Sequence, residues 1–272
     1  MKPFKSDCHI HSRFSPDGRG TEPEAVVAAA VEAGLDGICF TDHCECNDNV
    51  SIPPEFPRWP ALDHEEYFKT ISALKGKYPL RISVGVEIGQ GTQGLEYSQR
   101  YIDSHPWDFI LASNHNIRNE YDFSYMDYTD KDIDDLCRRY FEELYEVVEW
   151  GQFDVLAHLF YFIRYVYRAG YEIDINNYNG MMADIFKLLV STGKGMEINT
   201  SSIAGPYGKT IPGLEQLKLF RQLGGEIVTI GSDAHIPENV GLGGDLAREM
   251  MREAGFKYVA FYESRKPSFM TI

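Results

Sequence analysis

The sequence contains little cysteine and no long hydrophobic run. Five cysteines are scattered through 272 residues, and no two of them form a CxxC pair. Their odd number and wide separation argue against a disulfide framework. No apolar run approaches the roughly 20 residues that a membrane-spanning helix needs, and the residues after Met1 lack the apolar core of a signal peptide. We therefore expect a cytoplasmic protein without a membrane partner.

Positive charge is also scarce. The chain has 26 Lys and Arg against 41 Asp and Glu, which gives a formal net charge of −15. This negative field repels nucleic acid, so we expect no nucleic-acid partner, and a phosphate-bearing ligand would need a local positive centre. Neither GxGxxG nor a Walker phosphate-binding loop follows the first apolar run. A dinucleotide or P-loop site is therefore excluded at that point.

The chain does contain a repeated alternation of short apolar runs and helical patterns, and its 43% hydrophobic residues are typical of globular proteins. The expected strands are 6–11, 37–43, 81–88, 109–115, 155–159, 196–200, 227–233 and 258–262. Strands that alternate with helices imply a parallel sheet. Seven or eight such units predict an α/β closed barrel of the TIM type or a distorted relative, with an open doubly wound sheet as the alternative. No linker interrupts the pattern, so residues 1–272 are expected to form one domain.

Two helix signals are clear. Thr21 and Glu24 have the spacing of a capping box, with Pro23 in the first turn, which predicts a helix start there. Residues 130–150 carry an apolar stripe at helical spacing with acidic residues opposite, which predicts a long amphipathic helix.

Histidines and carboxylates end most of the predicted strands. They are His9, His11, Asp42, His43, Glu87, His115, His158, Asp233 and His235. The carboxyl ends of barrel strands meet at one rim, where the active site lies. Because side chains alternate along a strand, His9 and His11 share a face, and Asp7 is expected to join them as a supporting carboxylate. Imidazole and carboxylate ligands suit Zn, Fe or Mn, and this set is too large for one ion.

The order and spacing of these motifs resemble the PHP (polymerase and histidinol phosphatase) family, and within it the histidinol-phosphate phosphatase branch. The segments that carry the resemblance extend over most of the chain: DCHIHSRFSPDG, TDHCE, GVEIG, ASNH, LAHL, EINTS and GSDAH. The resemblance implies a distorted (β/α)7 TIM-like barrel with a trinuclear site for three divalent ions, which are Zn, Fe or Mn.

Carried over to the matching positions, the family pattern implies three sets of metal ligands. The sets are His9, His11, Glu87 and Asp233 for one ion, Glu87, His115 and His158 for a second, and Asp17, His43 and His235 for the third. Glu87 would bridge the first two ions. Asp17 comes from the resemblance alone, because the segment SPDG also reads as an ordinary turn.

The resemblance further implies metal-assisted hydrolysis of a small phosphomonoester. The favoured substrate is L-histidinol phosphate, in histidine biosynthesis. Glu87, Asp233 and His235 are the expected catalytic residues. Six neutral histidines and three carboxylates supply −3 and three divalent ions supply +6, which leaves about three positive charges for hydroxide and phosphate. An acidic protein can therefore still attract an anionic substrate.

Residues on the loops are expected to contact the substrate. Arg164, six residues after His158, is predicted to clamp phosphate, because a guanidinium can hold two oxygens at once; the alternative is a solvated surface residue. Asn199 lies in a segment that matches the family, but the arginine expected just after it is absent, and Lys209 is the predicted substitute. Arg118 is expected either to contact phosphate or to narrow the pocket.

The sequence leaves three other functions open. An amidohydrolase barrel also begins with HxH, although no lysine ends a strand here to bridge two metals. A PHP enzyme for another small phosphate ester or nucleotide would differ little in sequence. A metal-binding regulatory module would need a defect elsewhere, because all nine family ligands are present. His64 and His105 are expected at the surface, and Cys44 and Cys46 are expected to be incidental to metal binding.

Overall fold

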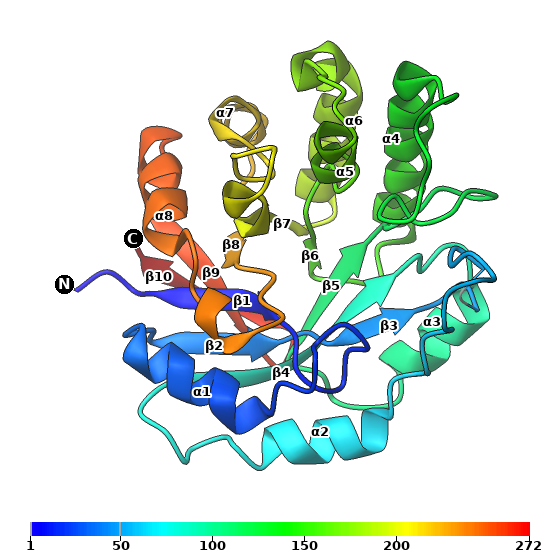
Figure 1. Ribbon diagram of the computed structural model, residues 1–272. Helices are drawn as coiled ribbons and strands as arrows, with labels where there is room; N and C mark the ends of the chain where they lie inside the picture. Colours follow the sequence, from blue (N-terminus) through cyan, green and yellow to red (C-terminus); the bar gives the residue numbers. More distant parts are fainter. Residues whose placement is uncertain (1, 49) are drawn as a thin grey trace.

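Seven parallel strands form a near-closed barrel in the computed structural model, which describes residues 2–48 and 50–272 (Figure 1). The strands, in their spatial order, are β1 (Ser6–Ile10), β2 (Gly37–Phe40), β4 (Arg81–Gly89), β5 (Phe109–Ser113), β6 (Val155–Leu156), β7 (Gly195–Asn199) and β8 (Val228–Gly231). The short strand β3 (His43–Glu45) continues the line of β2 and pairs with the second half of β4.

The first and last barrel strands meet at their carboxyl ends. The backbone N–H of His11 donates to the carbonyl of Ala234 at 2.8 Å, and the N–H of Asp233 donates to the carbonyl of His9 at 2.8 Å. This contact almost closes the sheet, so the barrel prediction is confirmed and the open doubly wound sheet is wrong. The contact also brings His9 and His11, near the start of the chain, next to Asp233 and His235, near its end.

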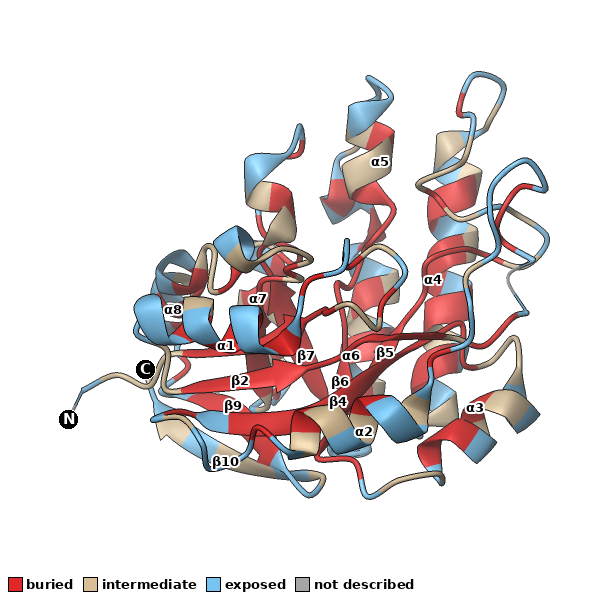
Figure 2. Cartoon of the chain, turned by 60° about the horizontal axis from the view of Figure 1, so that its bottom comes forward, coloured by how far each residue is buried: buried red, intermediate tan, exposed pale blue. Residues whose placement is uncertain are grey.

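Helices cover the outside of the barrel (Figure 1). They are α1 (Pro23–Glu32), α2 (His64–Ser72), α3 (Leu95–Ile102), α4 (Ile133–Trp150), α5 (Ile163–Arg168), α6 (Asn179–Ser191), α7 (Leu214–Gln222) and α8 (Gly244–Glu253), with short 3-10 turns at Ile175–Tyr178, Ser201–Ala204 and Pro237–Asn239. Figure 2 shows the strands buried and the helices exposed on their outward sides. In the part of the chain that the structure describes, no helix is both long and apolar enough to cross a membrane.

The long helix lies where its apolar stripe predicts it. The Asp132 side chain accepts a hydrogen bond from the backbone N–H of Asp135 and caps the start of α4. Gly151 ends the helix in the left-handed conformation, with φ of 65°, which glycine adopts at little cost.

The predicted capping box at Thr21 is wrong. Helix α1 begins at Pro23, its N-cap residue is Glu22, and no side chain caps it. The Thr21 hydroxyl instead donates to the backbone carbonyl of His235 at 3.1 Å. A tertiary partner has therefore replaced the local one, and the contact holds the loop after β8 against the loop after β1.

The last predicted strand exists but does not belong to the barrel. Strand β9 (Tyr258–Glu263) pairs antiparallel with β10 (Lys266–Thr271), a strand that the sequence pattern did not reveal. The Ser83 hydroxyl donates to the carbonyl of Tyr262 at 2.7 Å, and the N–H of Phe4 donates to the carbonyl of Thr271 at 2.9 Å. The hairpin therefore packs against β4 and the residues that precede β1. The barrel itself has seven strand–helix units and not eight.

Apolar side chains form two separate clusters, one between strands and helices and one inside the barrel. On β5, Ile110 and Ala112 belong to the outer cluster, whereas Phe109 and Leu111 belong to the inner one, as expected for side chains that alternate. The inner cluster consists of Cys8, Cys39, Phe109, Leu111, Val155, Ala157, Ala260, Phe261 and Tyr262. The hairpin thus completes the inner core with side chains from β9.

Replacement of Phe261 tests whether the hairpin stabilises the barrel. Phe261 is 1% exposed and packs edge-on against Phe4. We expect Phe261→Ala to lower the free energy of unfolding by about 3–5 kcal/mol, because it removes a buried ring and leaves a cavity. Chemical denaturation measures the change. The control is Phe269→Ala on β10, whose ring is 47% exposed; equal losses for both variants would contradict a hairpin contribution through the inner core.

Candidate metal centre

Nine histidines and carboxylates from distant parts of the chain converge at the carboxyl ends of the barrel strands. Glu87 lies on β4 and His43 on β3, while the others lie at or just after the ends of β1, β5, β6 and β8, or in the loop after β1. The remaining seven are His9, His11, Asp17, His115, His158, Asp233 and His235. Most are buried, whereas Asp17, Asp233 and His235 are partly exposed. The rim therefore carries the residues that end the predicted strands.

The carboxylate of Glu87 is fully buried at the middle of this cluster. Its two oxygens face five imidazoles. Oε2 lies 2.8 Å from His43 Nδ1, 3.3 Å from His9 Nε2 and 3.6 Å from His11 Nε2, and Oε1 lies 2.9 Å from His158 Nε2 and 3.2 Å from His115 Nε2. The single carboxylate of Glu87 thus contacts His9, His11 and His43 through one oxygen, and His115 and His158 through the other.

Two further carboxylates complete the arrangement on either side. Asp233 Oδ1 lies 3.7 Å from His9 Nε2 and 3.4 Å from His11 Nε2. Asp17 Oδ2 lies 3.1 Å from His235 Nε2, and also 3.6 Å from the Nε2 atom of His43. Donor atoms lie within 4.8 Å of one another in four overlapping groups of the centre, as a bound ion requires: His9, His11 and Glu87; His9, His158 and Asp233; His43, Glu87 and His115; and His11, His43 and His235.

Several of these buried atoms make no hydrogen bond to any described residue. They are Nε2 of His9, His11 and His235, Nδ1 of His43, Oε2 of Glu87 and Oδ1 of Asp17. Buried polar atoms are costly unless hydrogen-bonded or coordinated to a cation. Imidazole nitrogens and carboxylate oxygens that converge without protein donors between them are suitable ligands for transition-metal ions. The residues therefore fit a centre of divalent metal ions.

The electrostatics of the cluster also favour cations. Burial alone would lower the pKa of His9, but Glu197, Glu87 and Asp233 outweigh it and raise this pKa well above its usual value. Burial opposes charge at Glu87 as well, yet the surrounding histidines hold its pKa well below the usual range. The pKa of His115 rises to about 10, because attraction by Glu45 and Glu87 overcomes burial. Burial, together with neighbouring imidazoles, lowers the pKa of His11 and of His158. The cluster therefore holds charged and neutral imidazoles side by side, and the neutral form is the one that binds a metal ion.

Two glutamates that sequence reasoning missed orient the histidines from behind. His9 Nδ1 donates to Glu197 Oε1 at 2.7 Å, and His115 Nδ1 donates to Glu45 Oε1 at 2.9 Å. Glu197 Oε2 also accepts from the backbone N–H of His158 at 2.8 Å. A proton held on Nδ1 leaves Nε2 with its lone pair toward the centre. Strand alternation could have revealed both glutamates. Glu197 lies two residues before Asn199 on β7, and Glu45 lies two residues after His43 on β3, so the members of each pair point to the same face.

Asp42 and Ser15 orient a third histidine. The Ser15 hydroxyl donates to Asp42 Oδ1 at 2.8 Å, so it must accept from His11 Nδ1 at 3.0 Å. The Asp42 carboxylate also accepts from the backbone N–H groups of Ser12 at 2.7 Å and Ser15 at 2.9 Å. These bonds fix the turn that carries Asp17. The turn needs a glycine at Gly18, where a Cβ atom would lie 1.8 Å from the Ser12 carbonyl oxygen.

The predicted supporting role of Asp7 is wrong. Its carboxylate accepts from the backbone N–H groups of Ser232 at 2.9 Å and Gly241 at 2.8 Å, and it touches His9 only through the backbone N–H at 3.3 Å. The cause is an irregularity between Asp7 and Ile10, where the β1–β2 register shifts. A bulge breaks the two-residue alternation, so Cys8 packs in the inner cluster although the strand pattern placed it outside.

The predicted substrate residues fall into two groups. Arg164 and Asn199 lie at the centre: Arg164 Nη1 is 3.2 Å from Asp233 Oδ2, and Arg164 Nη2 is 3.4 Å from Asn199 Oδ1. Arg118 instead pairs with Glu146 at 2.7 Å on the outer side of α4, and Lys209 lies exposed with its amine over Tyr207. Neither contacts the nine centre residues within the described chain, so their roles stay predictions.

The residues expected to be incidental lie outside the centre. Cys44 and Cys46 are buried, and no cysteine joins a group of converging metal donors in the ranges 2–48 and 50–272. His64 Nδ1 lies 2.9 Å from His105 Nε2, with Glu65 3.7 Å from the latter nitrogen. Both rings are partly buried, because His105 stacks on Phe68 and His64 packs against Tyr101. The prediction of surface residues was therefore only partly right.

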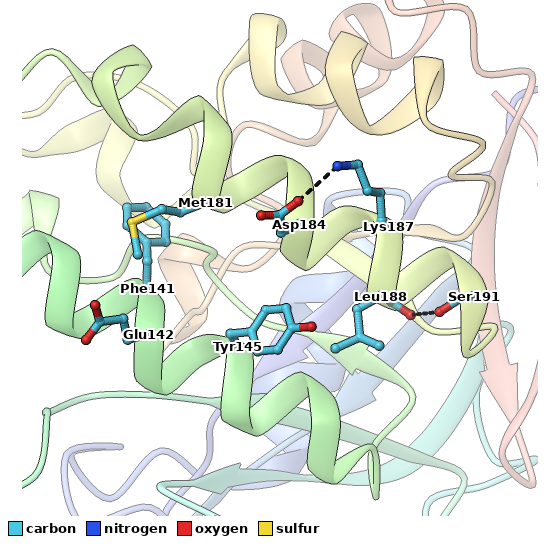
Figure 3. A pocket seen from close by; sticks show the side chains of 8 residues that line it. All are labelled: Phe141, Glu142, Tyr145, Met181, Asp184, Lys187, Leu188 and Ser191. Carbon is cyan, nitrogen blue, oxygen red and sulfur yellow. Dashed lines mark hydrogen bonds and ion pairs between the residues drawn. The ribbon is translucent and has the colours of Figure 1, made fainter.

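Hollows at the rim give access to the centre. One of about 350 Å³ is lined by Asp17, Asp233 and His235, and a smaller one of about 140 Å³ is lined by His43, Glu45 and Trp59. A larger groove of about 600 Å³ lies on the outer surface between α4 and α6 (Figure 3). Its lining residues are Phe141, Glu142, Tyr145, Met181, Asp184, Lys187, Leu188 and Ser191. None of the nine centre residues borders this groove, so the chemistry belongs to the rim.

Comparison with known proteins agrees with this geometry. The PHP domain family model matches residues 7–201. A histidinol-phosphatase of Lactococcus lactis is 31% identical over 268 residues, which cover 96% of each chain, and a probable histidinol-phosphatase of Thermotoga maritima is 30% identical over 254 residues, which cover 93% of this chain and 94% of that one. The crystal structure of the L. lactis histidinol phosphate phosphatase with Zn, L-histidinol and phosphate superposes with a TM-score of 0.83 at 30% identity, covering 97% of this chain and 98% of that one.

The glutamate behind His9 gives a direct test of the centre. We expect Glu197→Gln to weaken the binding of Zn²⁺ to the metal-depleted protein by about 10- to 100-fold, because an amide has only one acceptor oxygen for the two donors, His9 Nδ1 and the N–H of His158, that the carboxylate serves. Competition with a chromogenic chelator measures the affinity. Glu142→Gln on the outer face of α4 is the control, and unchanged affinity in Glu197→Gln would show that this residue serves only the backbone of His158.

Proposed function

The chain belongs to the PHP domain family, and we propose that it is a metal-dependent phosphatase that hydrolyses L-histidinol phosphate to L-histidinol and inorganic phosphate in histidine biosynthesis. The observation that carries the proposal is the convergence of nine imidazole and carboxylate side chains on the rim of a barrel that superposes on the L. lactis enzyme over almost its whole length. The family match also favours a PHP phosphatase over the amidohydrolase alternative.

The proximity of the side chains supports three sets of metal ligands. The proposed sets are His9, His11, Glu87 and Asp233 for one ion, Glu87, His115 and His158 for a second, and Asp17, His43 and His235 for the third. Glu87 would bridge the first two ions through its separate oxygens. Nitrogen and oxygen ligands of this kind accept Zn, Fe or Mn.

The reaction needs an activated water and a held phosphate. Divalent ions bound at the rim would polarise the phosphoryl oxygens and lower the pKa of water enough for it to attack phosphorus at neutral pH. Three carboxylates contribute −3 against +6 from three such ions, so the pocket attracts phosphate although the whole chain carries −15.

Arg164 is positioned to bind the phosphate of the substrate. Its side chain is 17% exposed, and its Nη1 atom already lies against the Asp233 carboxylate at the centre. Its Nε atom is buried and has no hydrogen-bond partner among the described residues. A guanidinium whose Nη1 atom is held by a carboxylate and whose Nε atom is unpaired can still donate to two phosphate oxygens.

Four polar residues at the rim hold one another in place: Arg164, Asn199, Asp233 and His235. Asn199 Nδ2 donates to Asp233 Oδ2 at 3.3 Å, while its Oδ1 accepts from Arg164. His235 Nδ1 donates to the backbone carbonyl of Asp233 at 2.9 Å, which turns Nε2 toward Asp17. We propose that Asp233 and His235, together with the bridging Glu87, position the ions and the attacking water.

We also infer that residues 1–272 act as one catalytic domain in the cytoplasm. The L. lactis and T. maritima relatives match along almost their full lengths, which leaves no room in them for a separate second domain. All five cysteines are buried free thiols, which suits a reducing compartment.

A substrate panel tests the proposed reaction. The purified protein, loaded with Zn²⁺ or Mn²⁺, is expected to release phosphate from L-histidinol phosphate with a kcat/KM at least about 100-fold above that for a sugar phosphate or a nucleotide, because only the former carries the amino-alcohol part. Excess chelator should abolish the reaction and added metal should restore it. Preference for a nucleotide or sugar phosphate would replace the proposed substrate, and failure with every ester would favour the binding module.

Arg164 gives a sharper test of phosphate binding. We expect Arg164→Ala to lower kcat/KM for L-histidinol phosphate by about 10- to 100-fold, because a charge-assisted double hydrogen bond to phosphate is lost. Arg164→Lys should restore only part of it, since an ammonium lacks the planar fork. The control is Arg168→Ala, later on the same helix, where the exposed side chain donates to the carbonyl of Ser124 and lies over the Tyr165 ring. Unchanged kinetics for Arg164→Ala would assign Arg164 to holding Asp233 alone.

A further inference from the structure

The loop between β5 and α4 holds a carboxylate that no part of the metal centre uses. Asp122 Oδ1 accepts from the backbone N–H of Ser124 at 2.6 Å and from the Tyr161 hydroxyl at 3.4 Å. Its own backbone N–H donates to the carbonyl of Ser51 at 2.8 Å, which fixes the loop in place. Both of these hydrogen bonds reach Oδ1 and not Oδ2.

Asp122 is half-buried and accepts fewer hydrogen bonds than the buried acids Asp42 and Asp7. Asp42 accepts from both the backbone and the hydroxyl of Ser12 and of Ser15, and Asp7 accepts from Ser232 and Gly241. Among the described residues, Asp122 accepts hydrogen bonds from the Ser124 backbone and from the Tyr161 hydroxyl. Burial raises its pKa, although the nearby His115 and Ser124 oppose the shift. A cation bound beside it would offset the cost of keeping it ionised.

An aromatic side chain connects this carboxylate to the centre. The Tyr161 ring packs against His115 at 4.7 Å and His158 at 5.1 Å between ring centroids, while its hydroxyl reaches Asp122. Arg164 lies over the same ring, at 5.0 Å from its centroid. The phenol therefore has an arginine suited to phosphate over its face and a carboxylate suited to a cation at its hydroxyl.

We propose that Asp122 binds the protonated nitrogen of the substrate and so selects phosphate esters that carry a cationic group a few bonds from the phosphorus. This inference rests on the proposed function, because it describes recognition at the same rim. L-Histidinol phosphate offers two such nitrogens, an ammonium and an imidazole that can be protonated. A neutral ester such as p-nitrophenyl phosphate offers none.

The test compares Asp122→Asn with the control Asp127→Asn in the metal-loaded protein. Asp127 lies in the same loop and, like Asp122, accepts from the backbone two residues later, but it is exposed and bonds only Thr129. Asp122→Asn is expected to raise KM for L-histidinol phosphate by about 10- to 100-fold with kcat within about threefold, and to leave kcat/KM for p-nitrophenyl phosphate unchanged. Asp127→Asn should change neither. Equal losses for both esters would overturn the proposal and make Asp122 a support of Tyr161.

Titration with L-histidinol keeps the result separate from the proposed reaction. Calorimetry should show about 10- to 100-fold weaker binding of L-histidinol to Asp122→Asn than to the unchanged protein, while inorganic phosphate binds both equally. Equal binding of L-histidinol, or none to the unchanged protein, would overturn the proposal even if no ester were hydrolysed. O-Phosphoethanolamine, which has the ammonium but no ring, separates the two nitrogens: a loss with this ligand assigns the ammonium, and a loss confined to L-histidinol assigns the imidazolium.

Discussion

The contact between the Glu87 carboxylate and five imidazoles is the constraint on which the rest of the structure depends. A charge with no exposed surface is expensive unless oppositely charged groups or hydrogen bonds surround it completely. Four strands, β1, β3, β5 and β6, must bring imidazoles to this one side chain, so the register of β4 against its neighbours is tied to the chemistry. His43 stands opposite Glu87 in the β3–β4 register, which shows how directly strand pairing places the first of these contacts.

A second layer of acids keeps those imidazoles turned in the useful direction. Glu197 accepts a hydrogen bond from His9 Nδ1, Glu45 accepts one from His115 Nδ1, and Ser15, held by Asp42, accepts one from His11 Nδ1. In each of these imidazoles the Nε2 lone pair faces the centre. These supports come from strands and tight turns, whose positions vary little. The protein's own hydrogen bonds therefore orient these imidazoles.

With divalent ions bound, the rim would carry positive charge although the whole chain is negative. The sign of the charge would change again from one side of Tyr161 to the other. Divalent ions and Arg164 would make one side of Tyr161 positive, and Asp122 makes the other negative. A substrate that carries phosphate at one end and a protonated nitrogen at the other matches this order. The overall negative charge of the chain repels polyanions at long range.

The sequence by itself predicted alternating strands and helices, the helix 130–150 and the histidines at the strand ends, because alternation, helical spacing and strand ends are local patterns. It left a closed barrel and an open sheet both possible, and the contact between β1 and β8 decided for the barrel. The sequence did not determine where Asp7 points, since a bulge in β1 reverses the alternation, nor that Thr21 bonds His235 instead of capping its helix. The roles of Glu197 and Asp122 were equally invisible, because each depends on residues far away in the chain. A buried polar atom takes whichever partner the folded backbone brings within reach, and only the tertiary structure decides which one that is.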